Sequence, residues 1–143
     1  MPRKSAAKAK PRAAMPAAGE PKGEMAIRTL AMPADTNQHG DIFGGWVMSQ
    51  MDIAGGITAG ARAKGRVATV AVTGFTFHRP VLVGDVVCCY ADITRVGTTS
   101  ITVHVEAWVA RRRESQARFK VTEGVFTFVA LDAKGKKRKV PPA

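Results

Sequence analysis

Residues 44–63 constrain the fold more than any other segment, because they have the length and composition of one long helix. The run GGWVMSQMDIAGGITAGARA is mostly small or apolar and contains no proline. That composition is typical of a packed helix of about five turns. Turn-forming residues crowd positions 35–41 just before it, and a glycine with two basic residues follows at positions 64–66. Both flanks therefore indicate where the helix begins and ends.

One carboxylate, Asp52, interrupts this helix. Met48 and Ser49 lie one turn before it and Gly55 and Gly56 one turn after it, so the carboxylate faces a small and apolar strip. A buried carboxylate without a partner is costly, so Asp52 is expected to have a partner or a chemical role. Each glycine in a helix interior costs about 1 kcal/mol relative to alanine, which indicates that another element approaches this face closely.

The remaining segments have the pattern of β-strands. Strands are expected at residues 25–31, 67–77, 86–96, 100–109 and 117–131. Apolar and polar residues alternate most cleanly in 100–109, which predicts a half-buried antiparallel strand. The apolar phase of the last segment slips near Glu123 and Gly124, which predicts a β-bulge. The fold class is therefore α+β, with an antiparallel sheet of about five strands wrapped around one long central helix.

Two stretches carry a resemblance to a known family. DTNQHGDIFGGWVMSQMD at 35–52, followed by GRVATVAVTGFTFHRPVLVGDVVCCY at 65–90, resembles the acyl-CoA hydrolases of the hot-dog fold, and above all the bacterial YciA-type thioesterases. The likeness extends from about residue 25 to about residue 139. It implies that two copies pair edge to edge as a homodimer with active sites at the dimer interface. It further implies a hexamer built as a trimer of dimers.

The net charge of +11 resides mainly at the two ends of the chain. Residues 1–23 carry six basic and one acidic group, residues 132–143 carry five and one, and the 108 residues between them carry eleven and nine. We expect a disordered basic tail at 1–23, the hydrolase domain at 24–132 and a basic C-terminal tail at 133–143. An organelle transit peptide is the alternative for the leader. Nucleic-acid binding through these ends is a lesser hypothesis.

Composition also bears on the compartment and on cofactors. No apolar run has the length of a membrane span, and no signal-peptide core is present, so a cytoplasmic protein is expected. Cys88 and Cys89 are adjacent on a strand and point to opposite faces, which predicts two reduced thiols with a packing role. The spacing of the Cys and His residues indicates no metal site. Coenzyme A is expected only as part of the substrate and product.

The candidate chemistry rests on a carboxylate, an amide and a helix N-terminus, because motifs for a serine nucleophile and for nucleotide-binding loops are absent from the sequence. Asp52 is suited to act on a thioester either as a general base towards water or as a direct nucleophile. Backbone N–H groups of Gly44 and Gly45 are suited to stabilise the oxyanion, and Asn37 to hold the water or the carbonyl. The resemblance implies that Asn37 and Asp52 come from different subunits. The alternatives are an ion pair of Asp52 with an arginine of the partner subunit, and a simple turn role for Asn37.

Coenzyme A carries phosphates that need cationic and N–H donors. The candidates are the end of one strand and the turn between two others: His78, Arg79, Arg95, Thr98, Thr99 and Ser100. A solvated loop position explains His78 equally well, and the other candidates are individually weak because arginines at a strand end are more often solvated than ligand-binding. The function that follows is hydrolysis of acyl-CoA to free coenzyme A and a carboxylic acid. The alternative is a protein of the same fold that binds acyl-CoA or an acyl carrier without hydrolysis. The sequence pattern does not indicate which acyl chain lengths the protein prefers.

Overall fold

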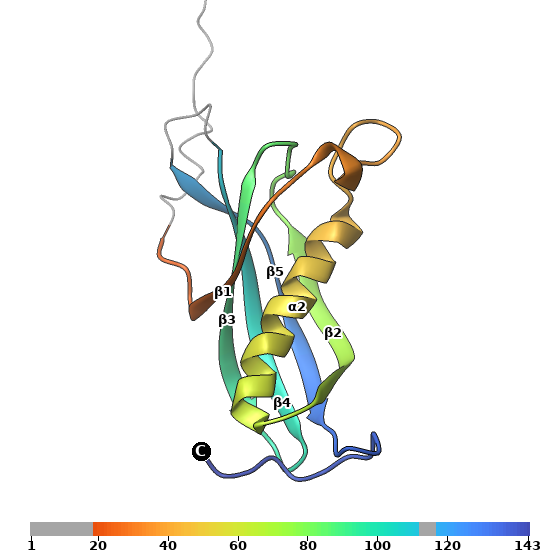
Figure 1. Ribbon diagram of the computed structural model, residues 1–143. Helices are drawn as coiled ribbons and strands as arrows, with labels where there is room; N and C mark the ends of the chain where they lie inside the picture. Colours follow the sequence, from red (N-terminus) through yellow and green to blue (C-terminus); the bar gives the residue numbers. More distant parts are fainter. Residues whose placement is uncertain (1–18, 112–116) are drawn as a thin grey trace, which may run out of the picture.

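The computed structural model describes residues 19–111 and 117–143 and contains a five-stranded antiparallel sheet curved around one long helix (Figure 1). The elements in chain order are β1 (Glu24–Leu30), the short 3-10 helix η1 (Pro33–Asp35), α2 (Gly44–Ala63), β2 (Val67–Phe77), β3 (Val86–Val96), β4 (Ser100–Ala110) and β5 (Arg118–Ala130). The strand order is β1-β3-β4-β5-β2. The predicted α+β architecture is confirmed. Most of the predicted N-terminal tail, residues 1–18, lies outside the described residues.

Helix α2 is buried along one face only. Val47, Met51 and Ala54 on that face are at most 1% exposed, whereas Ile53 and Ile57 on the opposite face are 51% and 52% exposed. The expectation of a buried helix therefore holds for the side that packs on the sheet. The helix lies beside strand β2 (Figure 1), and its outer face carries the exposed apolar side chains of Ile53 and Ile57.

The predicted close approach to the paired glycines of α2 is made by the ring of Phe128 on β5. A Cβ atom placed on Gly55 would lie 3.0 Å from this ring and 3.3 Å from Val105, whereas one placed on Gly56 would lie 3.7 Å from the same ring. Phe128 is 1% exposed and has little room to move. The absence of a side chain at Gly55 therefore sets the distance between helix and sheet.

We expect Gly55→Val to lower the free energy of unfolding by about 1–3 kcal/mol, because the added methyl groups overlap a fully packed ring. At the neighbouring Gly56 an added Cβ atom lies at an ordinary contact distance. Gly56→Ala is therefore expected to raise the free energy of unfolding by up to about 1 kcal/mol through helix propensity. Urea unfolding followed by circular dichroism measures both. Equal effects of the two substitutions would contradict the packing argument.

Strand β4 is buried on both faces. Its predicted core face is confirmed, with Ile101, Val103, Val105, Ala107 and Val109 all 0% exposed. The half-buried character predicted for this strand is wrong at Glu106 and Trp108, which are only 2% and 4% exposed. They face away from α2, and Trp108 packs there in a second small cluster with Cys88 and Tyr90. The chain before β1 adds to this cover, since the backbone N–H of Lys22 donates to Glu106 Oε1 at 3.3 Å.

The irregularity predicted in the last strand lies close to the expected position. Ala107 pairs with Thr122 while Trp108 pairs with Lys120, so Val121 is the additional residue of β5. Strand β2 has two register shifts against β5, and the one between Thr73 and Thr76 faces residues 123–125. The alternation of apolar and polar residues in β5 therefore changes face at Val121, about two residues before Glu123.

The basic C-terminal segment packs across the C-terminal end of helix α2. Arg138 Nη2 donates to the carbonyl of Ala63 at 2.6 Å, and Arg62 Nη1 donates to the carbonyl of Pro141 at 2.6 Å. The backbone N–H of Val140 donates to Thr98, which joins the same segment to the β3–β4 turn. A cation on the last carbonyls of a helix also complements its dipole.

Both cysteines are free and buried, on opposite sides of β3. Burial, with a smaller contribution from the neighbouring Cys88, raises the pKa of Cys89 to about 12. A thiol with that pKa is not a nucleophile near neutral pH, which agrees with the predicted packing role. No helix within the described ranges has both the length and the apolarity needed to cross a membrane.

Candidate active site

The N-terminal end of α2 presents backbone donors. The carbonyl of Phe43 accepts the N–H groups of Trp46 and Val47 at 3.1 and 3.3 Å, so the N–H groups of Gly44 and Gly45 precede the first intrahelical hydrogen bond. The N-cap residue, Phe43, makes no side-chain cap. A Cβ atom on Gly44 would lie 3.3 Å from the ring of Phe77, whereas one on Gly45 would meet nothing within 4 Å. The start of the helix is therefore open at Gly45 and closely approached by Phe77 at Gly44.

Asn37 organises the loop that leads into this helix. Its side-chain oxygen accepts the N–H groups of His39 at 2.8 Å and Asp41 at 3.1 Å, and its backbone N–H donates to the carbonyl of Asp41. Gly40 completes the turn at a φ of 85°, which favours glycine. The oxygen of Asn37 thus has the turn role that the sequence left open, and the NH₂ group of the same amide is the part suited to contact a ligand.

Asp52 lies in the middle of α2 and is half-buried beside the edge strand β2. Its Oδ1 accepts a hydrogen bond of 2.6 Å from Oγ1 of Thr69. Thr69 is a neutral donor, so this contact orients the carboxylate without neutralising it. A fixed carboxylate near an open strand edge is suited to proton transfer or to nucleophilic attack.

The predicted phosphate-binding residues fall into two groups at opposite ends of the protomer. His78 and Arg79 follow β2, whose last residue Phe77 lies beside the beginning of α2. The guanidinium of Arg79 stacks over the ring of Phe119 at 3.7 Å, and Nε2 of His78 lies 3.2 Å from Glu123 Oε2.

The second group lies near the C-terminal end of α2. The carbonyls of Thr98 and Thr99 accept backbone N–H groups from Val140 and Ala130, and Ser100 closes the turn by accepting the N–H of Gly97 at 2.7 Å. Arg95 precedes this turn and is exposed. A helix of 20 residues is about 30 Å long, so one protomer does not bring the two groups together.

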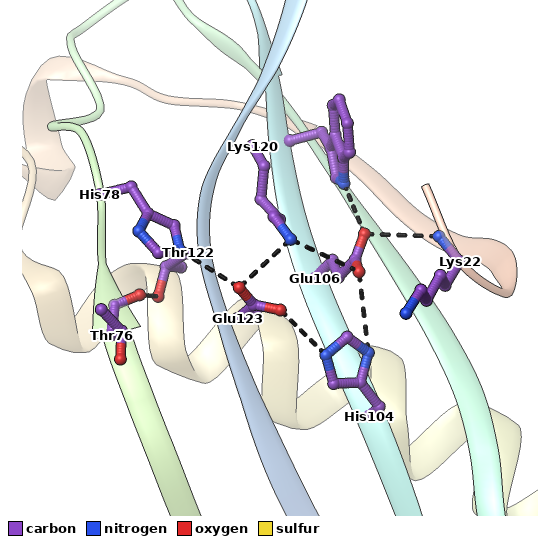
Figure 2. A network of polar contacts seen from close by, with 9 residues as sticks. Lys22, Thr76, His78, His104, Glu106, Lys120, Thr122 and Glu123 are labelled. Carbon is purple, nitrogen blue, oxygen red and sulfur yellow. Dashed lines mark hydrogen bonds and ion pairs between the residues drawn. The ribbon is translucent and has the colours of Figure 1, made fainter. Parts of the chain in front are cut away.

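A separate polar network covers the face of the sheet that points away from α2 (Figure 2). Glu106 on β4 and Glu123 on β5 are directly paired across the strands. His104 Nε2 lies 3.1 Å from Glu123 Oε1, and Lys120 Nζ lies 3.2 Å from Glu123 Oε2. Partial burial raises the pKa of Glu123, but hydrogen bonds from Lys120, His78 and His104 outweigh it and lower the pKa from 4.5 to about 2.

This lowered pKa predicts an acid-dependent contribution to stability. A carboxylate whose pKa is lower in the folded state stabilises that state fully above the unfolded pKa, near 4.5, and loses the contribution as the pH falls towards 2. We therefore expect Glu123→Gln to flatten the decrease of the free energy of unfolding between pH 4.5 and pH 2. Denaturant titrations at several pH values measure this slope. The exposed Glu24→Gln is the control, and an unchanged slope in Glu123→Gln would contradict the assignment.

Comparison with known proteins places the chain in a family. Residues 39–116 match the family model described as the thioesterase superfamily. The acyl-CoA thioester hydrolase YciA of Salmonella typhimurium is 58% identical over 123 residues, covering 85% of this chain and 92% of the relative. The chain belongs to the thioesterase superfamily. The predicted thioester hydrolase family is thereby confirmed.

Solved structures of thioesterases support the same assignment. A hexameric thioesterase from Yersinia pestis has a TM-score of 0.82 and 57% identity, covering 87% of this chain and all of that chain. An acyl-CoA hydrolase from Staphylococcus aureus, in complex with butyryl coenzyme A, coenzyme A and coenzyme A disulfide, has a TM-score of 0.73 and 31% identity, covering 80% and 70%. The latter enzyme has also been solved with single alanine substitutions of an aspartate, an asparagine and a threonine. A hexameric hotdog fold thioesterase of Campylobacter jejuni has a TM-score of 0.79 and 39% identity, covering 83% of this chain and 91% of that chain, so the expected hot-dog fold is confirmed.

Two features of this thioesterase escaped the sequence analysis. Thr69, the hydrogen-bond partner of Asp52, is one of several threonines in strand segments and carries no local signal. His104 stands on the face of its strand opposite the core residues, yet it is half-buried and bonded to Glu123. Both contacts join segments far apart in the chain, so strand register was needed to find them.

Proposed function

We propose that this thioesterase hydrolyses acyl-CoA to free coenzyme A and a carboxylic acid. In this proposal Asp52 acts as general base or as nucleophile, Asn37 holds the water or the thioester carbonyl, and the N–H groups of Gly44 and Gly45 stabilise the oxyanion. In the general-base route, a water oxygen bonds to the acyl carbon while Asp52 takes its proton. The carbon–sulfur bond then breaks, and the proton passes to the thiolate of coenzyme A.

The observation that supports this proposal is the carboxylate of Asp52, which is held by a hydrogen bond from Thr69. The sequence spacings of Asn37, Asp52 and Thr69 also match those of residues studied in a related hydrolase. The asparagine and aspartate substituted in the Staphylococcus aureus acyl-CoA hydrolase are 15 positions apart, and its aspartate and threonine are 17 positions apart. Asn37, Asp52 and Thr69 have the same two spacings. The Thr69 hydrogen bond gives the third residue a physical role, since it orients Oδ1 and leaves Oδ2 to act on the substrate.

Helix geometry supports a site shared between two subunits. Gly45 and Asp52 are seven positions apart, which at 1.5 Å per residue is about 10 Å along the axis. One carbonyl carbon cannot contact both positions of the same helix. An isologous dimer with antiparallel helices brings the Asp52 of one subunit towards the Gly44–Gly45 end of the other. The same symmetry brings the Arg95–Ser100 turn closer to the partner's Arg79.

Strand β2 is the edge through which we propose this dimer forms. It pairs only with β5 in the sheet order, and Val70 and Val72 on it are 56% and 38% exposed. The exposed Ile53 and Ile57 of α2 lie on the adjoining face. Exposed edges and apolar patches of this kind are typical of subunit contacts. We further propose a trimer of dimers, as the Yersinia pestis thioesterase is hexameric, and a cytoplasmic location.

The proposal is tested by incubating purified protein with butyryl coenzyme A and following the free thiol with a colour-forming reagent. Release of one thiol per substrate, dependent on enzyme concentration, is the expected result. Binding of butyryl coenzyme A without thiol release would instead support the alternative of an acyl-CoA binding protein. Sedimentation of the same sample measures the assembly.

A further inference from the structure

The polar network on the outer face of the sheet has the composition of a cation site. Ligand atoms of His104, Glu106 and Glu123 all lie within 4.8 Å of one another. Two paired carboxylates on adjacent strands repel each other unless positive charge lies between them. Lys120 supplies one positive charge, at 3.2 Å from Glu123 Oε2 and 3.8 Å from Glu106 Oε2. When the histidines are counted as neutral, Glu106, Glu123 and Lys120 together carry one net negative charge.

Each ring nitrogen of His104 faces a carboxylate oxygen, which also indicates that the network has too little positive charge. Its Nε2 lies 3.1 Å from Glu123 Oε1 and its Nδ1 lies 3.8 Å from Glu106 Oε2. A neutral imidazole carries only one N–H, so one ring nitrogen then turns its lone pair towards a carboxylate. A metal ion bound at that nitrogen removes this conflict.

The spacing of the ligand atoms suits a metal ion of the zinc class as well as it suits the hydrogen bond that joins His104 to Glu123. Zn–N and Zn–O bonds of about 2.0–2.2 Å at a tetrahedral centre place ligand atoms about 3.3–3.5 Å apart, close to the 3.1 Å between His104 Nε2 and Glu123 Oε1. Glu106 is also held as metal-ligating carboxylates are, because its Oε1 accepts hydrogen bonds from Trp108 Nε1 at 2.8 Å and from the N–H of Lys22 at 3.3 Å. Its Oε2 is left facing His104 and Lys120 (Figure 2).

We propose that His104, Glu106 and Glu123 bind a divalent transition metal ion such as Zn²⁺, with the ammonium of Lys120 occupying the same site when the metal is absent. One imidazole nitrogen and two carboxylate oxygens suit zinc better than magnesium or calcium, which prefer oxygen ligands alone. The remaining position is filled by water. The site lies on the opposite side of the sheet from α2 and Asp52, and its link to the predicted phosphate-binding residues is the contact of Glu123 Oε2 with His78 Nε2 at 3.2 Å.

The test measures Zn²⁺ binding to the full chain by equilibrium dialysis after treatment with a chelator. One Zn²⁺ per chain is expected in the parent and in the control His39→Ala, whose histidine lies in an exposed loop. His104→Ala and Glu123→Gln are both expected to lose binding while retaining the circular dichroism of the fold. If His104→Ala does not fold, Glu123→Gln decides the question alone. Absence of binding in the parent, or equal binding in these variants, overturns the proposal.

A second variant separates a metal site from a purely structural salt-bridge network. Lys120→Met removes the competing ammonium, so it is expected to tighten Zn²⁺ binding by about tenfold, within the range typical of groups that surround a metal. Lys136→Met, at an exposed lysine elsewhere, is the control and leaves the affinity unchanged. Binding that is weakened by Lys120→Met would show that the lysine and the metal do not compete, which contradicts the shared position.

Discussion

Asp52→Asn is expected to abolish turnover of acyl-CoA while leaving the fold and the oligomer intact. The amide keeps the shape of the carboxylate and can still accept the hydrogen bond from Thr69, but it cannot take a proton from water or form an anhydride. A positioned general base contributes about 10²–10⁴ in rate, and loss of a nucleophile costs at least as much. Thiol release from butyryl coenzyme A measures the rate, and sedimentation measures the assembly. A rate equal to that of the parent contradicts the role of Asp52, and a collapsed mutant favours a structural ion pair instead.

Mixed oligomers test whether the site is shared between subunits. Asn37→Ala and Asp52→Asn, each inactive alone, are co-expressed with different affinity tags and isolated as mixed assemblies. If Asn37 and Asp52 meet across the dimer interface, one site of each mixed dimer contains both native residues, and activity returns. If the two residues act within one chain, both sites of the mixed dimer stay defective. No recovery in the mixed assembly therefore contradicts the shared site without contradicting hydrolysis itself.

Gly45→Pro is expected to lower kcat by about 10²–10³, the effect of removing one oxyanion donor. Proline removes the backbone N–H and is tolerated in the first turn of a helix, where that N–H has no intrahelical acceptor. There is space for the substitution, because a Cβ atom at Gly45 meets nothing within 4 Å.

Gly45→Ala is the matched control for this change, since alanine adds a Cβ atom but retains the N–H group. Its kcat is expected to stay close to that of the parent. An equal loss in both variants would assign the effect to the side chain and would exclude the proposed oxyanion donor. Thermal unfolding of the two variants shows whether the helix begins normally.

Local signals in the sequence were sufficient for most of the fold. Helix α2 begins and ends where glycine and basic residues indicate, and β2 and β3 span the predicted residues, because turn chemistry and apolar period are properties of adjacent positions. The burial of residues on the outer face of β4 was not predictable in this way. Glu106 resembles a solvent-facing residue until Trp108, Lys22 and the cross-strand Glu123 are placed around it.

The candidate site was predictable for a different reason. Asp52 stood out because a carboxylate among small apolar helix residues conflicts with packing, and such conflicts mark functional positions. Thr69 did not stand out, because a threonine in a strand is ordinary. Its role appears only when the middle of α2 and the beginning of β2 are brought together by the curvature of the sheet.

The contacts of the segment after β5 constrain the order in which the protein can fold. Arg138 and Pro141 secure the last turn of α2, and each contacts a residue more than 70 positions earlier in the chain. The end of the helix therefore gains these contacts only after strands β2 to β5 have been synthesised.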